Sequence, residues 1–194
     1  MKSLFFRRVL AFVIDFFIVN ILFSIITVGF ESNSSLIEEA NDLLTKYNNQ
    51  EITIDVYNEN IQRLNYELQK SNISINILSF VVIVGYYFVF NYLNGGRTIG
   101  KKICKIKIVE KNNKPSIKAI ILRGLFIYGS LSTLYNIIFV FVFDVTNFSR
   151  GYTIVTYIEA LLMMICLFTI LYRKDKRGLH DIVAGTEVIE EVNR

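Results

Sequence analysis

The sequence predicts an all-α polytopic membrane protein with four transmembrane helices. Hydrophobic residues make up 53% of its 194 residues, there is a single proline, and the apolar residues collect in runs that soluble domains of this length rarely contain. A helix needs about 20 residues, at about 1.5 Å rise each, to cross a bilayer. Four stretches reach this length, at about 4–30, 73–93, 119–143 and 151–172. A soluble enzyme, a disordered regulator and a disulfide scaffold are therefore disfavoured.

The first stretch, 4–30, is interpreted as a retained helix rather than a cleaved signal peptide. Its start is basic, but Asp15 interrupts the apolar run, which continues beyond Val28. No small-x-small cleavage site follows. All four stretches are rich in Ile, Phe, Leu and Val, and their length favours helices over strands.

Charge asymmetry predicts the orientation. The 31–72 segment carries three bases against eight acids, a net charge of −5, whereas 94–123 carries nine bases against one acid, a net charge of +8. Lys and Arg concentrate in cytoplasmic loops. Both termini, the basic loop 94–118 and the tail 173–194 are therefore predicted to be cytoplasmic, and 31–72 extracytoplasmic. We expect a multi-pass membrane protein with no nucleic-acid partner.

The 31–72 segment repeats apolar residues at helical spacing, from Ile37 to Leu68, and has no Cys, Pro or Gly. It predicts one or two amphipathic helices that extend the second transmembrane helix outward. Two interpretations are open: a solvated helical loop without a ligand, or a cap that docks a partner or substrate.

The basic loop 94–118 begins with a glycine-rich turn that superficially resembles a phosphate-binding loop. That interpretation is rejected, because Lys102 stands where the motif needs Ser or Thr and a membrane helix precedes it. Residues 103–109 are β-branched and partly alternating, as are 186–189, so a short cytoplasmic β-hairpin of these two strands is predicted. Its bases would also meet anionic lipid headgroups.

Four pieces of the sequence resemble the RDD family of bacterial membrane proteins: RVLAFVID at 8–15, GRTIGKKICKIKIV at 96–109, ILR at 121–123 and RGLHDIVAGTEV at 177–188. The family is named for one arginine and two aspartates, and the resemblance implies that these are Arg8, Asp15 and Asp181. Cys104 and Lys105 depart from its usual pattern. The family is described as of unknown function, with a role in transport suspected, so the resemblance implies the architecture more than the activity. It also implies that the protein lies in a bacterial inner membrane.

Arg8 and Asp15 fall on one face of the first helix, with Asp15 about 10 Å deeper in the membrane. Helical side chains lean toward the amino end, so Arg8 is expected to snorkel to the cytoplasmic headgroups. A carboxylate within the membrane needs a partner or a proton. Asp15 is therefore expected either to pair with Arg123 and fix the helix register, or to titrate as part of transport.

Glu159 is the second carboxylate inside an apolar stretch, roughly 10 Å below the outer surface. Its depth differs from that of Asp15, so the two do not form a carboxylate dyad. They are interpreted as two stations on one transport path, with Tyr157, Tyr135 or Asn136 between them. The alternative is a structural role for Glu159.

His180 is the only histidine. It is a candidate sensor of cytoplasmic pH, or a residue that caps or hydrogen-bonds a turn. Asp181 is expected to cap the cytoplasmic segment or to bind the basic loop. With one histidine and two distant cysteines, we expect no metal site, no cofactor, no disulfide and no enzyme activity.

Two functions are consistent with the sequence. The first is proton-coupled transport of a monovalent cation or small solute, with Asp15 as the titrating group. The second is a non-catalytic scaffold or accessory subunit that binds a partner through the 31–72 loop. Four helices are few for a water-lined path, so a homo-oligomer or a partner membrane protein is expected. Small residues of the third helix would allow close helix contact: Gly124, Gly129, Ser130, Ser132 and Thr133.

Overall fold

In the computed structural model, which describes residues 4–30, 33–111 and 113–191, three helices are long and apolar enough to cross a membrane. They are α1 (Leu4–Thr27), the continuous run Ile73–Leu93 and α9 (Val145–Tyr172). Their outward faces are apolar, with Phe17 60%, Ile25 65% and Phe168 58% exposed. Such faces need hydrocarbon rather than water as solvent, so the predicted helical membrane class is confirmed. Glu31 of the predicted outer loop and residues 192–194 of the tail lie outside the described residues.

The second membrane helix changes its winding along its length. It begins as α4 (Ile73–Ile83), widens into the π-helix η1 (Val84–Phe90) and ends as α5 (Asn91–Leu93). The wider turn carries three consecutive buried aromatic residues, Tyr86, Tyr87 and Phe88. Single π-helical turns inside α-helices occur frequently at functional sites.

The third apolar stretch is not the single helix predicted at 119–143. It consists of α7 (Ile117–Gly124) and α8 (Ser130–Phe139), with a non-helical bend between them. Gly129 ends this bend with a φ of +66°, a left-handed conformation that glycine adopts readily. The ten residues of α8 span about 15 Å, half of the hydrocarbon core. The sequence prediction was wrong here because it relied on the length of the apolar run.

Two of the five small residues of this stretch, Gly124 and Ser130, pack inside the protein. A Cβ on Gly124 would lie 2.5 Å from the ring of Phe88, and Ser130 is buried. Gly129, Ser132 and Thr133 are partly exposed, and nothing lies within 4 Å of a Cβ on Gly129, so close helix contact through this part of the stretch stays a prediction.

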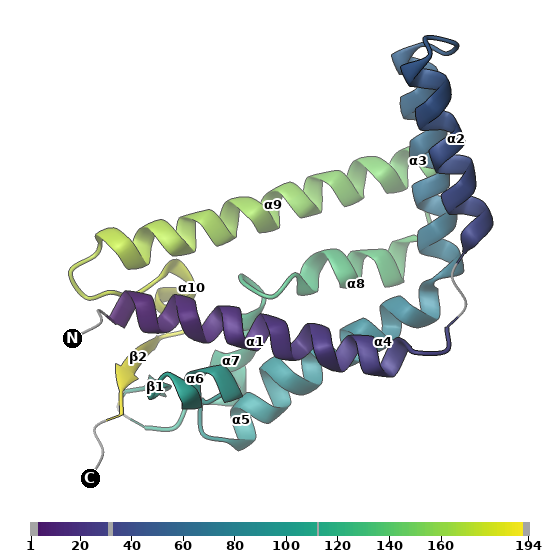
Figure 1. The fold of residues 1–194 in the computed structure, drawn as a ribbon. Coiled ribbons are helices and arrows are strands. Elements are labelled where there is room, and N and C mark those ends of the chain that lie inside the picture. Colours follow the sequence, from purple (N-terminus) through teal and green to yellow (C-terminus); the bar gives the residue numbers. More distant parts are fainter. Residues whose placement is uncertain (1–3, 31–32, 112, 192–194) are drawn as a thin grey trace.

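The outer segment forms the predicted amphipathic helices, α2 (Ser34–Asn48) and α3 (Ile54–Ser71). They form an antiparallel hairpin that projects from the bundle at the end opposite both termini (Figure 1). Tyr47 and Tyr57 stack at 4.9 Å between ring centroids, and Arg63 forms ion pairs with Glu39 and Glu67. As predicted, α3 leads directly into α4 through Asn72.

At the other end, two short helices and two strands close the bundle. They are α6 (Ile99–Ile103), β1 (Ile106–Glu110), α10 (Leu179–Val183) and β2 (Thr186–Glu190). The predicted pairing of the strands is confirmed as an antiparallel ladder, with Ile108 opposite Val188. It is not a hairpin, because α7, α8, α9 and α10 lie between the strands in sequence.

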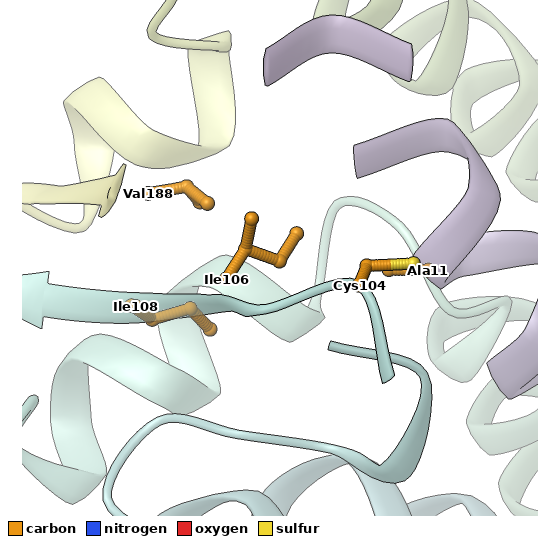
Figure 2. Packing of buried hydrophobic residues seen from close by; sticks show 5 residues of the cluster. All are labelled: Ala11, Cys104, Ile106, Ile108 and Val188. Carbon is orange, nitrogen blue, oxygen red and sulfur yellow. The ribbon is translucent and has the colours of Figure 1, made fainter. Parts of the chain in front are cut away.

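The sheet packs against the first turns of α1. Figure 2 shows Cys104 beside Ala11 of α1, with Ile106 and Val188 continuing the same buried cluster. The predicted strand began at residue 103, but residues 99–103 form α6, whose first turn is capped by the Thr98 hydroxyl. Because α6 packs on α1 beside this cluster, residues 98–101 lie next to Asp15.

Candidate functional site

Asp181 is the centre of a buried charge cluster. Its side chain is fully buried, and each oxygen forms an ion pair with a different arginine, Oδ2 with Arg8 and Oδ1 with Arg123. Oδ2 also accepts the backbone N–H of Gly178 at 2.9 Å, which caps the first turn of α10. Asp181 therefore joins α1, α7 and α10 through one carboxylate. The predicted capping role is present, whereas the binding partners are an arginine of α1 and an arginine of α7 rather than the basic loop 94–118.

Arg8 does not snorkel to the headgroups, which corrects the sequence prediction. Only 9% of it is exposed, and besides Asp181 it donates to the carbonyl of Lys176 at 2.6 Å. The tail after α9 folds over the first turns of α1 and supplies these acceptors. A buried guanidinium needs such partners, because an unpaired buried charge is strongly unfavourable.

Arg123 does not pair with Asp15, a second correction. At the end of α7 it faces α10 and β2, where it meets Asp181 and donates to the Thr186 hydroxyl at 3.2 Å. The third apolar stretch bends just after this residue, so the position of Arg123 follows from the bend and not from its depth in a straight helix. Its Nε has no hydrogen-bond partner among the described residues.

Asp15 is held by uncharged donors. Oδ1 accepts from the Tyr86 hydroxyl at 2.6 Å and the Gly100 N–H at 2.8 Å, and Oδ2 accepts from the Thr98 hydroxyl at 2.5 Å. Only 2% of Asp15 is exposed. The backbone approach requires Gly100, because a Cβ there would lie 2.3 Å from the carbonyl oxygen of Ala11. The π-helical turn of η1 supplies Tyr86, and α6 supplies the other two donors.

Lys101 is a site residue that the sequence did not single out. It is 7% exposed, and its Nζ donates to the Thr98 hydroxyl at 3.3 Å. Burial lowers the pKa of Lys101 to about 7. The sequence showed it only as one of nine bases in a basic segment, and its burial follows from the packing of α6 on α1. The capping threonine three residues earlier was the available signal.

His180 is buried and lies against Arg8, with 3.2 Å between His180 Nε2 and the guanidinium. Burial, with Arg123 and Arg8 nearby, lowers the pKa of His180 well below its ordinary value of 6.5. The imidazole is therefore neutral near pH 7, and Nε2 accepts because a guanidinium only donates. This environment favours the hydrogen-bonding interpretation over that of a sensor near neutral pH.

Glu159 is remote from the cluster. Its Oε1 accepts the backbone N–H of Leu131 at 2.8 Å, in the first turn of α8. A carboxylate there satisfies a free N–H and complements the helix dipole. This contact favours the predicted alternative of a structural role for Glu159. Its partner, the start of α8, could not be predicted from a straight helix.

The three residues suggested as intermediate stations between Asp15 and Glu159 contact neither carboxylate through the hydrogen bonds that they form. Tyr135 donates to the carbonyl of Phe148, Asn136 donates to Gln69, and Tyr157 is 72% exposed. The structure therefore does not connect the two carboxylates through these three side chains.

One cavity adjoins the cluster, and a second cavity shares part of its lining. The first, of about 320 Å³, is lined by five acidic or basic residues, Arg8, Asp15, Lys101, Arg123 and His180, and otherwise mainly by apolar ones. The second, of about 420 Å³, lies farther along α1. Four residues line both cavities: Phe12, Ile127, Tyr128 and Met163. Ile127 and Tyr128 belong to the bend between α7 and α8, so this non-helical segment lies where the cavities meet.

Five of the six residues predicted from the sequence therefore gather at one site. Arg8, Arg123, His180 and Asp181 form the contacts around one carboxylate, and Asp15 lines the same cavity. A sequence model described as the RDD family matches residues 3–185. No curated protein and no solved structure matches the chain.

Proposed function

The chain belongs to the RDD family, and we propose that it is a small, non-catalytic membrane transport protein that couples proton movement to that of a small solute. The observation that carries the proposal is the non-helical bend between α7 and α8, whose residues Ile127 and Tyr128 line two neighbouring cavities. Both cavities are bounded by α1 and by the bend at Ile127 and Tyr128. Together they follow α1 from the charge cluster toward Phe23.

Non-helical backbone at membrane depth is tolerated only where it is buried in protein or lines a cavity. Transporters commonly place their substrate sites at such broken helices. Here the bend lines both cavities, and Tyr128 stacks on Tyr87 of η1 at 3.7 Å between centroids. A rearrangement of Phe12, Tyr128 and Met163 would join the cavities, which supports an alternating path along α1.

The proton-carrying groups in this proposal are Asp15 and Lys101. The Thr98 hydroxyl donates to Asp15 and accepts from the Lys101 ammonium, so one proton can pass from Lys101 to Thr98 while the hydroxyl proton passes to Asp15. The transfer leaves a neutral amine and a neutral carboxyl. Reversal restores both charges. The pKa of Lys101, about 7, places a charge change in the physiological range.

A proteoliposome assay tests the proposal. The purified protein is reconstituted with an enclosed pH dye, a pH gradient is imposed, and the chlorides of sodium, potassium and lithium and the salt sodium octanesulfonate are added in turn. We expect solute-dependent dissipation of the gradient with the wild type and none with Asp15→Asn or Lys101→Met. Asp175→Asn, which alters an exposed ion pair with Arg173, is the matched control and should transport normally.

Two results would contradict transport through this site. One is an Asp15→Asn protein that still dissipates the gradient. The other is a folded wild type that responds to none of the four salts, which would shift support to the second function.

The second function is a scaffold or accessory subunit, and the α2–α3 hairpin favours it. The hairpin stands beyond the bundle, belongs to a segment of net charge −5 and exposes Ile37 and Leu44 by nearly half. A scaffold needs this surface but not a titrating Asp15. Replacing Ile37 and Leu44 by Ser should therefore remove its cellular function while Asp15→Asn retains it, and transport predicts the reverse.

A further inference from the structure

The charges around the first cavity do not balance. Arg8, Arg123 and Lys101 line it as cations, and Asp15 is the carboxylate that lines it among the described residues. Asp181 is shared by the two arginines and does not line the cavity. With His180 neutral, three cations face two carboxylates, which leaves a net charge of +1 while Lys101 is protonated.

The remainder of the cavity is apolar. Its walls are formed by Val9, Phe12 and Val13 of α1 and by Met163, Leu167 and Ile170 of α9. The volume of about 320 Å³ lies at the low end of small-molecule sites, which span roughly 300–1,000 Å³. It corresponds to about ten water molecules at about 30 Å³ each. A ligand that matches both this volume and this lining has one small polar head and a short apolar tail.

We propose that the cavity binds a monoanionic amphiphile, with its head against Lys101, Arg8 and Arg123 and its single short tail between α1 and α9. This inference deepens the proposed transport function by naming the class of solute. A single negative charge would neutralise the site, and a cationic solute would instead add to its positive charge. Arg123 also offers a buried Nε–H without a partner among the described residues.

Binding of the anion and protonation of Lys101 are then coupled. The charged groups near Lys101 are Asp15 and Arg8 from α1 and Arg123 from α7, with neutral His180 from α10. Of these, Asp15 favours the protonated amine, and both arginines oppose it. An added anion would oppose the arginines, so each bound solute would hold one proton on Lys101. The solute and the proton would move in the same direction.

The test is calorimetric titration of the full chain in phosphatidylcholine nanodiscs, with empty discs subtracted. The probe is octanesulfonate, whose charge does not change between pH 6 and 9. Octyltrimethylammonium tests the sign of the head group, octanamide tests the need for charge, and methanesulfonate tests the need for the tail. We expect octanesulfonate to bind at least tenfold more tightly than each of the other three at pH 6.

Two variants locate the site. Loss of a hydrogen bond to a charged group typically weakens binding about tenfold or more. Lys101→Met should therefore raise the dissociation constant of octanesulfonate about tenfold at pH 6. It should also abolish the loss of affinity that the wild type shows above about pH 7. Val13→Phe fills the apolar wall and should weaken binding without changing the pH profile. Leu10→Phe, on the same helix but outside the cavity lining, is the matched control and should bind as the wild type does.

A lipid headgroup and a free amphiphile share the proposed chemistry, and adding phosphatidylglycerol to the discs separates them. Competition with octanesulfonate would identify lipid as the source of the anion, and unchanged binding would identify a free solute. Equal binding of octanesulfonate and octyltrimethylammonium, or a Lys101→Met protein that binds as the wild type does, would overturn the inference. Binding without flux would leave this site standing and remove the transport function, whereas sodium flux without octanesulfonate binding would do the opposite.

Discussion

Asp15 and Asp181 are both carboxylates buried near the same cavity, yet their partners differ in kind. Asp181 meets two guanidinium groups, whereas Asp15 meets a phenol, a hydroxyl and a backbone N–H. A carboxylate between two arginines is fixed as an anion by charge. Asp15 has no cation within hydrogen-bond distance among the described residues. In the proposed function, therefore, Asp181 holds three helices together and Asp15 is the group that exchanges a proton.

Replacing Asp181 by Asn should destabilise the protein severely. The substitution leaves Arg8 and Arg123 buried without their counter-charge, which typically costs about 3–5 kcal/mol. The thermal unfolding midpoint in detergent measures the effect, with Asp175→Asn as the control for loss of a solvent-exposed ion pair. Midpoints that fall equally in the two variants would show that the cluster does not hold α1, α7 and α10 together.

Lys101 should make the stability of the protein depend on pH. Its folded pKa of about 7 lies below the ordinary value of 10.5, so between these values the unfolded chain binds more protons than the folded one. Stability therefore rises with pH above 7, by at most about 1.4 kcal/mol per pH unit for one proton. Unfolding midpoints of the wild type from pH 7 to 9 should increase, and those of Lys101→Met should be flatter.

The pH window from 7 to 9 excludes a contribution from His180. The pKa of His180 is lowered from 6.5, so its contribution is lost only as the pH falls below about 6.5. A wild-type midpoint that is constant from pH 7 to 9 would indicate that Lys101 is solvated.

At the level of elements, the start of α8 depends on a hydrogen-bond acceptor from another helix, α9. Because α8 begins in the apolar region, its free N–H groups cannot rely on water, and Glu159 of α9 accepts from Leu131. Glu159→Gln keeps an acceptor and should change stability little. Glu159→Ala should cost about 0.5–2 kcal/mol, as loss of a helix cap does.

The same two variants separate a structural role for Glu159 from a transport station. In the proteoliposome assay Glu159→Gln should retain solute-dependent dissipation. A Glu159→Gln variant that is fully stable but does not dissipate the gradient would indicate that Glu159 takes part in transport.

The contact of α6 with α1 depends on the absence of a side chain at residue 100. Gly100→Ala would place a Cβ 2.3 Å from the carbonyl oxygen of Ala11 and 2.8 Å from Asp15 Oδ1. We expect a loss of about 1–3 kcal/mol from this overpacking, together with loss of transport. Gly85→Ala is the control, because nothing lies within 4 Å of its Cβ position and alanine favours a helix. Equal midpoints for both variants would contradict the close approach.

For the whole molecule, the charge cluster and the α2–α3 hairpin lie at opposite ends of the bundle (Figure 1). The positive-inside rule then predicts that the hairpin faces outward and both termini face the cytoplasm. Cysteines introduced at Asn58 and Lys174, both exposed, can be labelled with a membrane-impermeant maleimide. Asn58→Cys should react in intact cells, and Lys174→Cys only after permeabilisation.

The native cysteines serve as the control for this measurement. Cys104 and Cys166 are free and buried, so the unmodified protein should label weakly. Reaction of Lys174→Cys in intact cells would reverse the predicted orientation.

The sequence by itself determined the helical membrane class, the amphipathic outer helices, the two strand segments and the charged positions Arg8, Asp15 and Asp181. These features depend on properties of contiguous sequence. The length of an apolar run decides whether a segment can span a membrane, and apolar periodicity decides whether a segment is an amphipathic helix. The resemblance in four short pieces supplied the three charged positions.

Only the tertiary structure decided which charges meet. Arg123 pairs with Asp181 rather than Asp15 because the third stretch bends after Gly124 and brings the end of α7 to α10. Lys101 is buried because α6 packs on α1, and Glu159 caps α8 because that helix begins within the apolar region. Ion pairing, burial and capping depend on distances between segments remote in sequence, which neither hydropathy nor spacing along the chain specifies.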